Sequence, residues 1–256
     1  MSTPDRFVEK PPHIDARRMR HIPDEDLFAA LALPPSTSAA ARRAARRGEP
    51  MDAPVTLDAW IRHFRLRERP APLTNVQGWA QHLRAAGGSQ AEDIIRQAAR
   101  LHGDSVDYVD PAKGKSGLYG FHYMHWMRPL VDAYALTRDE AHVRAFVRLF
   151  NAWYDTRDLV RGQWQPDVIW YTLGLAIRSN LFSLAYHTFR GSPELDPATQ
   201  VRLLKTILGA CRWLAEEHDA FRYSNWQVHG VAHLLQLALF WPEFREAPAW
   251  RAVAEA

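Results

Sequence analysis

The chain has 256 residues, of which 47% are hydrophobic and 24% charged, an ordinary globular composition with room for one large domain or two small ones. The single cysteine, Cys211, excludes an internal disulfide, and no stretch of about 18 apolar residues predicts a membrane span. The net charge is +3, and nearly all of the basic residues are arginines. Arginine suits binding of carboxylate, sulfate or phosphate, but a high arginine content is also typical of a GC-rich genome.

Taken in chain order, residues 1–22 are predicted to be a polar tail without an apolar signal core, and residues 23–256 a single helical domain. Apolar residues spaced three and four apart predict helices that lengthen toward the C-terminus. These helices are expected over Asp24–Leu33, Ser36–Arg47, Leu57–Leu66, Asn75–Ala86, Ala91–Leu101, Met124–Leu136, Arg138–Tyr154, Pro166–Phe189, Pro197–His218 and Asn225–Phe240. A last helix from about Ala247 meets no cap or breaker, which indicates a fragment of a longer chain.

Residues 103–120 are rich in glycine and predict a long loop, and Asp196 and Ser224 are predicted N-caps of the helices that follow them. No strand signal of any strength appears. Long helices alternating with short turns therefore predict an all-α fold of stacked helical hairpins, an incomplete (α/α) toroid, with a straight solenoid as the alternative.

The segment Tyr223–Gly230 holds the first candidate site. Asn225 and His229 lie one helical turn apart, and His233 and Gln236 extend the same stripe. An asparagine can donate a hydrogen bond to a carboxylate, and a neutral histidine can accept a proton. The alternatives are polar residues that bridge helices, or a metal held by the two histidines, although no acidic third ligand is near in sequence.

A second candidate is the spacing of Trp170, Gly174 and Arg178 at four-residue steps in the predicted helix from Pro166. A sugar could stack on the tryptophan, in the gap left by the glycine, while the arginine binds an anionic group. The alternative is a glycine for close helix packing and a buried ion pair of Arg178.

The segment Tyr119–Pro129 is the third candidate, because aromatic and imidazole groups are dense in it. His122 and Trp126 would share a helix face. Core packing explains Trp126 readily and explains His122 and His125 less well. No phosphate-binding loop, dinucleotide fingerprint, nucleophile elbow or paired-cysteine motif occurs, so no cofactor or metal is predicted. One short arginine cluster, Arg42–Arg47, is typical of a solvated helix and does not predict nucleic-acid binding.

Together, four segments resemble the N-terminal toroid of heparinase II/III-like polysaccharide lyases over roughly residues 24–256. They are Tyr119–Tyr134, Trp153–Tyr154, Trp170–Arg178 and Ser224–Phe244. The resemblance implies an (α/α) toroid followed by a C-terminal β-sandwich domain that this chain does not include. It also implies β-elimination on an acidic, uronate-containing polysaccharide of the heparin, heparan sulfate or alginate type, in a periplasmic or secreted location, although no signal segment is visible.

By this resemblance, Asn225 matches the family's carboxylate-neutralising asparagine. Trp226 stands where many relatives have histidine, so His229 is the substitute candidate for the base, and Tyr223 completes the predicted catalytic set. The family's catalytic tyrosine lies further along the chain. Predicted substrate contacts are His122, Trp126, Trp170, Tyr171, Arg178, Trp226 and His233.

Two other functions stay open. A toroidal glycoside hydrolase needs two carboxylates facing one cleft, and Asp155, Asp158 and Asp167 are the candidates. A non-catalytic helical domain that binds acidic glycans needs only the basic and aromatic groups. The lyase interpretation depends on Asn225 and Arg178 facing the same concave opening. Membrane insertion is not expected.

Overall fold

The computed structural model describes residues 16–33, 55–67, 76–103, 105–109, 115–161, 167–218 and 224–256. Within these ranges every regular element is a helix, and the only β-type pairing is an isolated bridge between Leu31 and Phe244. The prediction of an all-α fold is therefore confirmed. The helix expected over Ser36–Arg47 lies outside the described residues.

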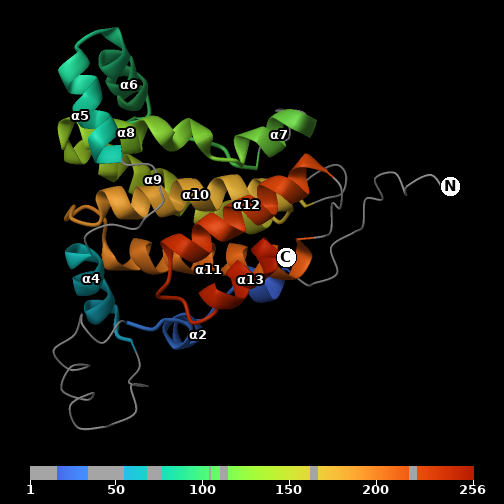
Figure 1. The fold of residues 1–256 in the computed structure, drawn as a ribbon. Coiled ribbons are helices and arrows are strands. Elements are labelled where there is room, and N and C mark those ends of the chain that lie inside the picture. Colours follow the sequence, from blue (N-terminus) through green and yellow to red (C-terminus); the bar gives the residue numbers. More distant parts are fainter. Residues whose placement is uncertain are drawn as a thin grey trace, which may run out of the picture.

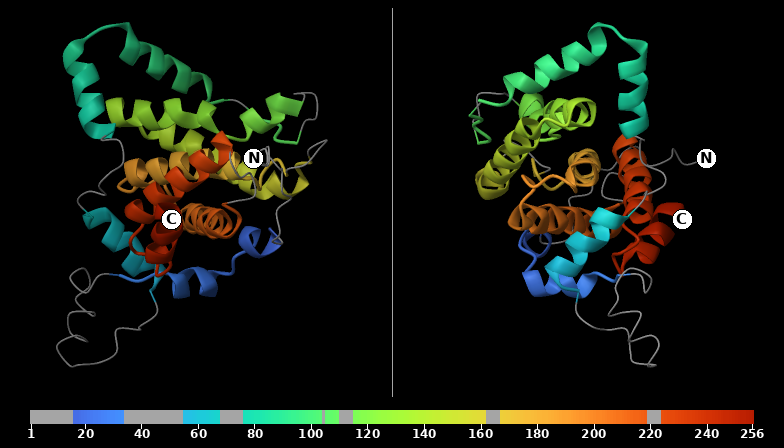
Figure 2. Two further views of the ribbon diagram at one scale, coloured as in Figure 1. Left: turned by 45° about the vertical axis from the view of Figure 1, so that its right-hand side comes forward. Right: turned by 90° about the vertical axis from the view of Figure 1, so that its left-hand side faces the viewer.

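Pairs of helices packed side by side make up the molecule (Figure 1). The pairs are α5 (Val76–Ala86) with α6 (Ser89–Arg100), α8 (Arg128–Thr137) with α9 (Glu140–Thr156), α10 (Thr172–Phe189) with α11 (Pro197–Glu217), and α12 (Asn225–Phe240) with α13 (Ala247–Glu255). Helix α10 contacts both α8 and α12 and so lies at the centre, while α5 and α6 pack on α8 at one edge (Figure 2). Closure of such pairs into a toroid stays a prediction.

Capping side chains define the starts of helices α11 and α12. Asp196 Oδ1 accepts a hydrogen bond from the Thr199 amide at 2.9 Å, and Pro197 occupies the first turn of α11. Ser224 Oγ accepts from the Gln227 amide at 3.4 Å at the start of α12. Both caps were predicted from the sequence, and both are confirmed.

Helix α4 (Leu57–Leu66) ties the N-terminal part of the chain to the C-terminal half. Trp60 Nε1 donates to the Tyr186 hydroxyl at 2.7 Å, and this hydroxyl donates to Gln200 Oε1 at 2.9 Å. The Trp60 ring stacks on Trp241, with centroids 6.1 Å apart. Burial of each large ring contributes roughly 2–3 kcal/mol, so α4 is held firmly against α10, α11 and the end of α12.

A buried charged group, the Glu243 cluster, lies beside these rings and consists of His63, Arg67 and Glu243. Glu243 Oε1 is 2.7 Å from His63 Nε2, and Glu243 Oε2 is 3.4 Å from Arg67 Nη1. The Glu243 backbone carbonyl also accepts from the Ala32 amide at 2.6 Å. Because Glu243 is only 2% exposed, its charge depends on these partners, and the cluster joins α4 to the turn after α12.

The structure corrects several predictions of helices. Helix α2 (Asp24–Ala30) ends three residues earlier than expected. Helix α7 (Lys115–Phe121) forms inside the predicted loop, because Leu118 and Tyr119 pack into the core there. Helix α10 begins at Thr172, six residues later than expected from Pro166. Asp167 Oδ1 accepts from the amides of Ile169 and Trp170 at 2.7 and 3.0 Å, and this local turn takes the place of the first helical turn.

The end of the predicted polar tail is also corrected. Residues 17–20 form the short helix α1 (Arg17–Arg20), and Met19 and Ile22 are buried in the core. Helix α1 packs on α11 at Gly209, where any side chain would meet the Met19 carbonyl. Two apolar residues spaced three apart are enough to anchor this segment, although its surroundings in sequence are polar.

Acidification is expected to destabilise the protein through His187 on α10. Burial, together with the nearby positive charges of Arg190 and Arg67, lowers the pKa of His187 from 6.5 to about 4. Arg190 Nη1 donates to His187 Nδ1 at 3.2 Å, and the Phe240 ring packs edge-on at 5.9 Å. Because the folded pKa lies below the unfolded value of 6.5, stability is complete above about pH 6.5 and is lost as the pH falls toward 4.

Between pH 7 and pH 5 this linkage removes about 1–2 kcal/mol from the free energy of unfolding. Urea denaturation at the two pH values measures the loss. His187→Gln should show a smaller pH dependence than the unaltered protein, because the substituted side chain does not titrate. An identical pH dependence in both proteins would contradict the assignment to His187.

Candidate functional site

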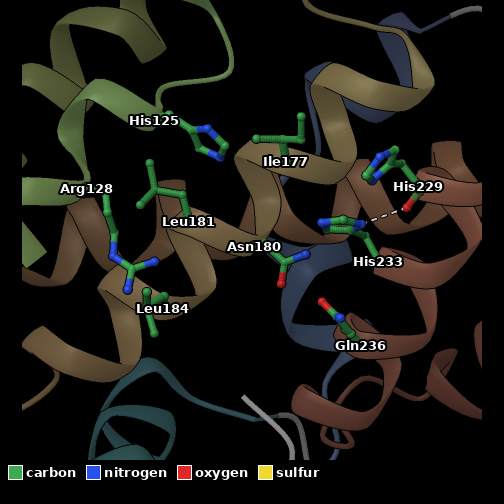
Figure 3. A pocket seen from close by; sticks show the side chains of 9 residues that line it. All are labelled: His125, Arg128, Ile177, Asn180, Leu181, Leu184, His229, His233 and Gln236. Atoms are coloured by element: carbon green, nitrogen blue, oxygen red, sulfur yellow. Dashed lines mark hydrogen bonds between the residues drawn. The ribbon is translucent and has the colours of Figure 1, made fainter. Parts of the chain in front are cut away.

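A pocket of about 580 Å³ opens between the 3-10 helix η2 (His125–Met127), α8, α10 and α12. This volume is typical of small-molecule binding sites. The pocket is lined by His125, Arg128, Ile177, Asn180, Leu181, Leu184, His229, His233 and Gln236 (Figure 3).

Two polar walls face each other across an apolar floor (Figure 3). His125 and Arg128, from η2 and the start of α8, form the η2 wall, and three side chains of α12 form the opposite wall. Helix α10 runs between them and supplies the floor, with the amide of Asn180 among three aliphatic side chains. An apolar floor between hydrogen-bonding walls suits a sugar chain, whose rings have both C–H faces and hydroxyl edges.

The wall from α12 contains three of the four residues of the predicted polar stripe, His229, His233 and Gln236, and does not include Asn225. Asn225 begins the helix and is exposed, and at 1.5 Å of rise per residue His229 lies about 6 Å along the axis. His233 Nδ1 donates to the His229 carbonyl at 2.7 Å, which leaves Nε2 of a neutral ring as an acceptor. Burial lowers the pKa of His233, as do His229 and His125, although the hydrogen bond to His229 opposes this.

The electrostatic character of the pocket is basic. Its lining includes one arginine, three histidines and two amides, and none of the nine residues is a carboxylate. Burial lowers the pKa of His125, and the positive charge of Arg128 adds to this effect. With a permanent cation and no carboxylate among its nine described lining residues, the pocket favours an acidic ligand over a cationic one.

Arg178 does not reach this pocket, and Asn225 is not among its lining residues either. The predictions that Arg178 contacts substrate and that it faces the same concave opening as Asn225 are therefore wrong. Its side chain is 1% exposed, and its guanidinium donates to the carbonyls of His122 and Ile169 at 2.7 and 2.6 Å. The guanidinium also lies 5.1 Å from the centre of the Trp153 ring. Burial lowers the pKa of Arg178 to about 10, so the charge remains at neutral pH and is used to hold backbone segments together.

Trp170 and Tyr171 are likewise buried, against the prediction that they contact sugar. Trp170 lies before α10, under the Arg20 guanidinium at 5.7 Å and against α11. The Tyr171 ring occupies the space beside Gly174, where an added Cβ would lie 2.5 Å from Tyr171 Cε1. The gap expected to hold a sugar is therefore filled by a side chain of the protein itself.

In the third predicted segment, Tyr119–Pro129, the side chains also point in other directions than the sequence predicted. His122 is buried, with Nε2 bonded to the Tyr108 carbonyl at 3.0 Å and Nδ1 accepting from Trp153 Nε1 at 3.3 Å. Trp126 is half-buried and donates to the Phe121 carbonyl at 3.0 Å. Met124 has a positive φ of 63°, which breaks the helix expected here and turns His125 toward the pocket in place of His122.

The remaining predicted residues lie at one end of α12. Trp226 is half-buried and packs on Tyr171, with ring centroids 5.5 Å apart. Tyr223 lies outside the described residues. The structure thus brings His229 and His233 together in the pocket wall, with Asn225 one turn beyond them on the same helix.

None of the three aspartates considered for a hydrolase lines the pocket. Asp155 pairs with Arg202 at 3.1 Å, Asp158 pairs with Arg20 at 3.1 Å, and Asp167 caps the turn before α10. Among the described residues no group of three or more potential metal ligands comes together, and no described helix is long and apolar enough to cross a membrane. Asp158 and Asp167 both pair with Arg20, at 3.1 and 3.5 Å, but none of these carboxylates lines the pocket.

A family model described as heparinase II/III N-terminus matches residues 30–256. The chain belongs to this heparinase II/III family. Its fold is similar to solved structures of a heparinase III (TM-score 0.62, 16% identity, 91% of this chain and 37% of that one) and of the heparan sulfate lyase HepC from Pedobacter heparinus (TM-score 0.61, 18% identity, 90% and 38%). The chain thus spans less than two-fifths of the length of these structures. No curated protein sequence matched.

In this heparinase II/III domain, sequence reasoning missed two residues of the pocket. Asn180 follows Arg178 and Ser179 in a short polar break of the mainly apolar helix α10, and this break was the available signal. Arg128 lies near the end of the candidate segment Tyr119–Pro129, but the direction of its side chain depends on how α8 packs on α10. The sequence pattern alone did not distinguish it from the other arginines.

Proposed function

We propose that this chain is the helical part of a polysaccharide lyase that cleaves uronic-acid-containing glycans by β-elimination. The observation that carries the proposal is a basic pocket without carboxylates that runs along the helix begun by Asn225. Membership of the heparinase II/III family supports the same reaction class. Hydrolysis fits the pocket less well, because that reaction needs two carboxylates at one site and the nine described lining residues include none.

The proposed chemistry begins with the sugar carboxylate. The C5 proton of a uronic acid becomes acidic enough to remove when the adjoining carboxylate is stabilised, and the Asn225 amide would donate to this group. His229, about 6 Å along the helix, would take the C5 proton. The C5–H electrons form the C4–C5 double bond, and the C4–O4 bond breaks with its electron pair going to O4.

The departing O4 takes a proton from a general acid, a role for which the sequence predicts no residue of this chain; Tyr223 belongs to the predicted catalytic set without a stated role. His233 lies two turns, about 12 Å, from Asn225, which is too far to act on the same sugar ring. Its Nε2 acceptor would instead bind a hydroxyl of a neighbouring sugar. The base and the substrate contact thus come from successive turns of one helix.

The reaction is tested by its product. The protein is incubated separately with heparin, heparan sulfate, alginate and a neutral glucan. Ultraviolet-absorbing, unsaturated ends are expected from at least one uronate polymer and none from the glucan. New reducing ends without absorbance would favour the hydrolase. Binding of an acidic polymer without any turnover would favour a non-catalytic glycan-binding domain. Either result would contradict the lyase proposal.

A further inference from the structure

We infer that Arg128 binds a second anionic group of the glycan, on the opposite side of the pocket from α12, and that Asp132 positions its guanidinium for this purpose. The inference rests on the proposed function, since it concerns the same pocket. It adds a determinant of substrate choice that is separate from the group that would stabilise the reacting carboxylate.

The geometry of Arg128 leaves its outer edge available. Nε donates to Asp132 Oδ1 at 2.7 Å, one turn further along α8. No hydrogen bond from Nη1 or Nη2 is found within the described part of the chain, and the guanidinium points into the pocket between His125 and Leu184 (Figure 3). The two Nη groups form a planar fork that fits two oxygens of a carboxylate or sulfate.

Burial differs between the two partners in a way that suits a positioning role. The Asp132 side chain is 11% exposed and the Arg128 side chain 38% exposed. An exposed pair at this spacing would be mobile, but an aspartate fixed in the wall of α8 limits the rotamers of the arginine that it binds. The guanidinium is therefore partly preorganised, which lowers the entropy cost of binding an anion.

A neighbouring group points to a polar ligand in the same space. Asn180 Nδ2, on the floor between the two walls, is buried and has no hydrogen-bond partner among the described residues. A buried amide donor left unpaired costs free energy, and a hydroxyl or oxyanion of a ligand would satisfy it. Asn180 lies between Arg128 and Gln236 in the pocket (Figure 3).

The position of Arg128 assigns the anion to a different sugar from the reacting one. The stripe on α12 runs from Asn225 to Gln236, eleven residues or about 16 Å, which is longer than one sugar ring. Arg128 stands on the facing wall, whereas Asn225 stands at the end of α12. The anion is either a sulfate ester or the carboxylate of a second uronate.

Calorimetric titration of the 256-residue chain tests this inference without requiring turnover. The probes are three oligosaccharides of equal length: a sulfated heparan type, the same compound after desulfation, and an oligouronate from alginate. Arg128→Gln is expected to weaken binding of the preferred probe by about tenfold, since charge-assisted hydrogen bonds are lost. A loss confined to the sulfated probe identifies a sulfate, and a loss with the oligouronate identifies a carboxylate.

Two further variants keep the test sharp. Arg128→Lys retains the charge and loses the planar fork, so it should bind the preferred probe with intermediate affinity. It replaces Arg128→Gln as the test variant if Arg128→Gln folds poorly. Arg144→Gln is the matched control, because Arg144 is exposed on α9 and pairs with Glu194 away from the pocket. Its affinity should equal that of the unaltered chain.

Equal affinity of the unaltered chain and both Arg128 variants for all three probes would overturn the inference, as would no binding of any probe. The lyase proposal fails separately. If no unsaturated product forms but Arg128→Gln still weakens binding, the anion site stands without the reaction. If product forms at the normal rate and affinity in Arg128→Gln, the reaction stands without the anion site.

Discussion

Asn225→Ala is expected to lower the kcat of the lyase reaction by roughly 100- to 1,000-fold, the usual effect of removing one donor that stabilises developing negative charge. Asn225 is exposed in the first turn of α12. The free backbone amides at this N-terminus of the helix also favour an anion. Loss of its side-chain amide should leave the fold intact. The rate of formation of ultraviolet-absorbing ends on the best uronate polymer measures the effect.

The form of the loss distinguishes a catalytic from a binding role. If the amide acts mainly on the charge that develops during C5 deprotonation, kcat falls and KM changes by no more than about threefold. Asn225→Asp should be at least as inactive, because a carboxylate would repel the sugar acid. Gln97→Ala, which removes an exposed amide from α6, is the control. Activity of Asn225→Ala close to that of the control would rule out the proposed role.

Glu243→Ala is expected to lower the free energy of unfolding by about 3–5 kcal/mol, because it removes the carboxylate that compensates two buried cationic or polar partners. His63 and Arg67 would lose their contacts at 2.7 and 3.4 Å and remain in a site closed by aromatic rings. Chemical denaturation followed by circular dichroism measures the change. The pocket is expected to be disturbed only indirectly, since none of the three residues lines it.

Two variants control for this prediction. Glu255→Ala removes an exposed carboxylate paired with Arg251 on α13 and should cost less than about 0.5 kcal/mol. Glu243→Gln keeps an oxygen that can accept from His63 and should cost less than the alanine variant. A loss below about 1 kcal/mol in Glu243→Ala would show that the cluster is not important for stability.

Most helices were predictable because their determinants are local in sequence. Periodic apolar residues located α4, α5 and α12 within about one residue, and the caps Asp196 and Ser224 marked two starts correctly. The errors came where a local signal was outweighed. The glycines of residues 103–120 predicted a loop where α7 forms. Helix α10 begins later than predicted because Asp167 caps a local turn, and the spacing of apolar residues does not reveal such a side-chain hydrogen bond.

The candidate site was only half predictable, for a related reason. The α12 wall follows from spacing along one helix, whereas the η2 wall depends on how α8 packs on α10 and on the positive φ of Met124. Arg178 shows the limit most clearly. Its partner His122 is 56 residues away in sequence, so no local pattern could reveal that its guanidinium is bound to backbone carbonyls.

The bonds of Arg178 have a consequence for how such domains diversify. Because the guanidinium binds the main-chain oxygens of His122 and Ile169, this clamp uses the side chain of neither residue. The segments that contain His122 and Ile169 are thus held together by contacts that do not involve the residues lining the pocket. Under the proposed function, substitutions at pocket residues such as Arg128 and Gln236 would change the preference for one polymer over another and leave this clamp unaltered.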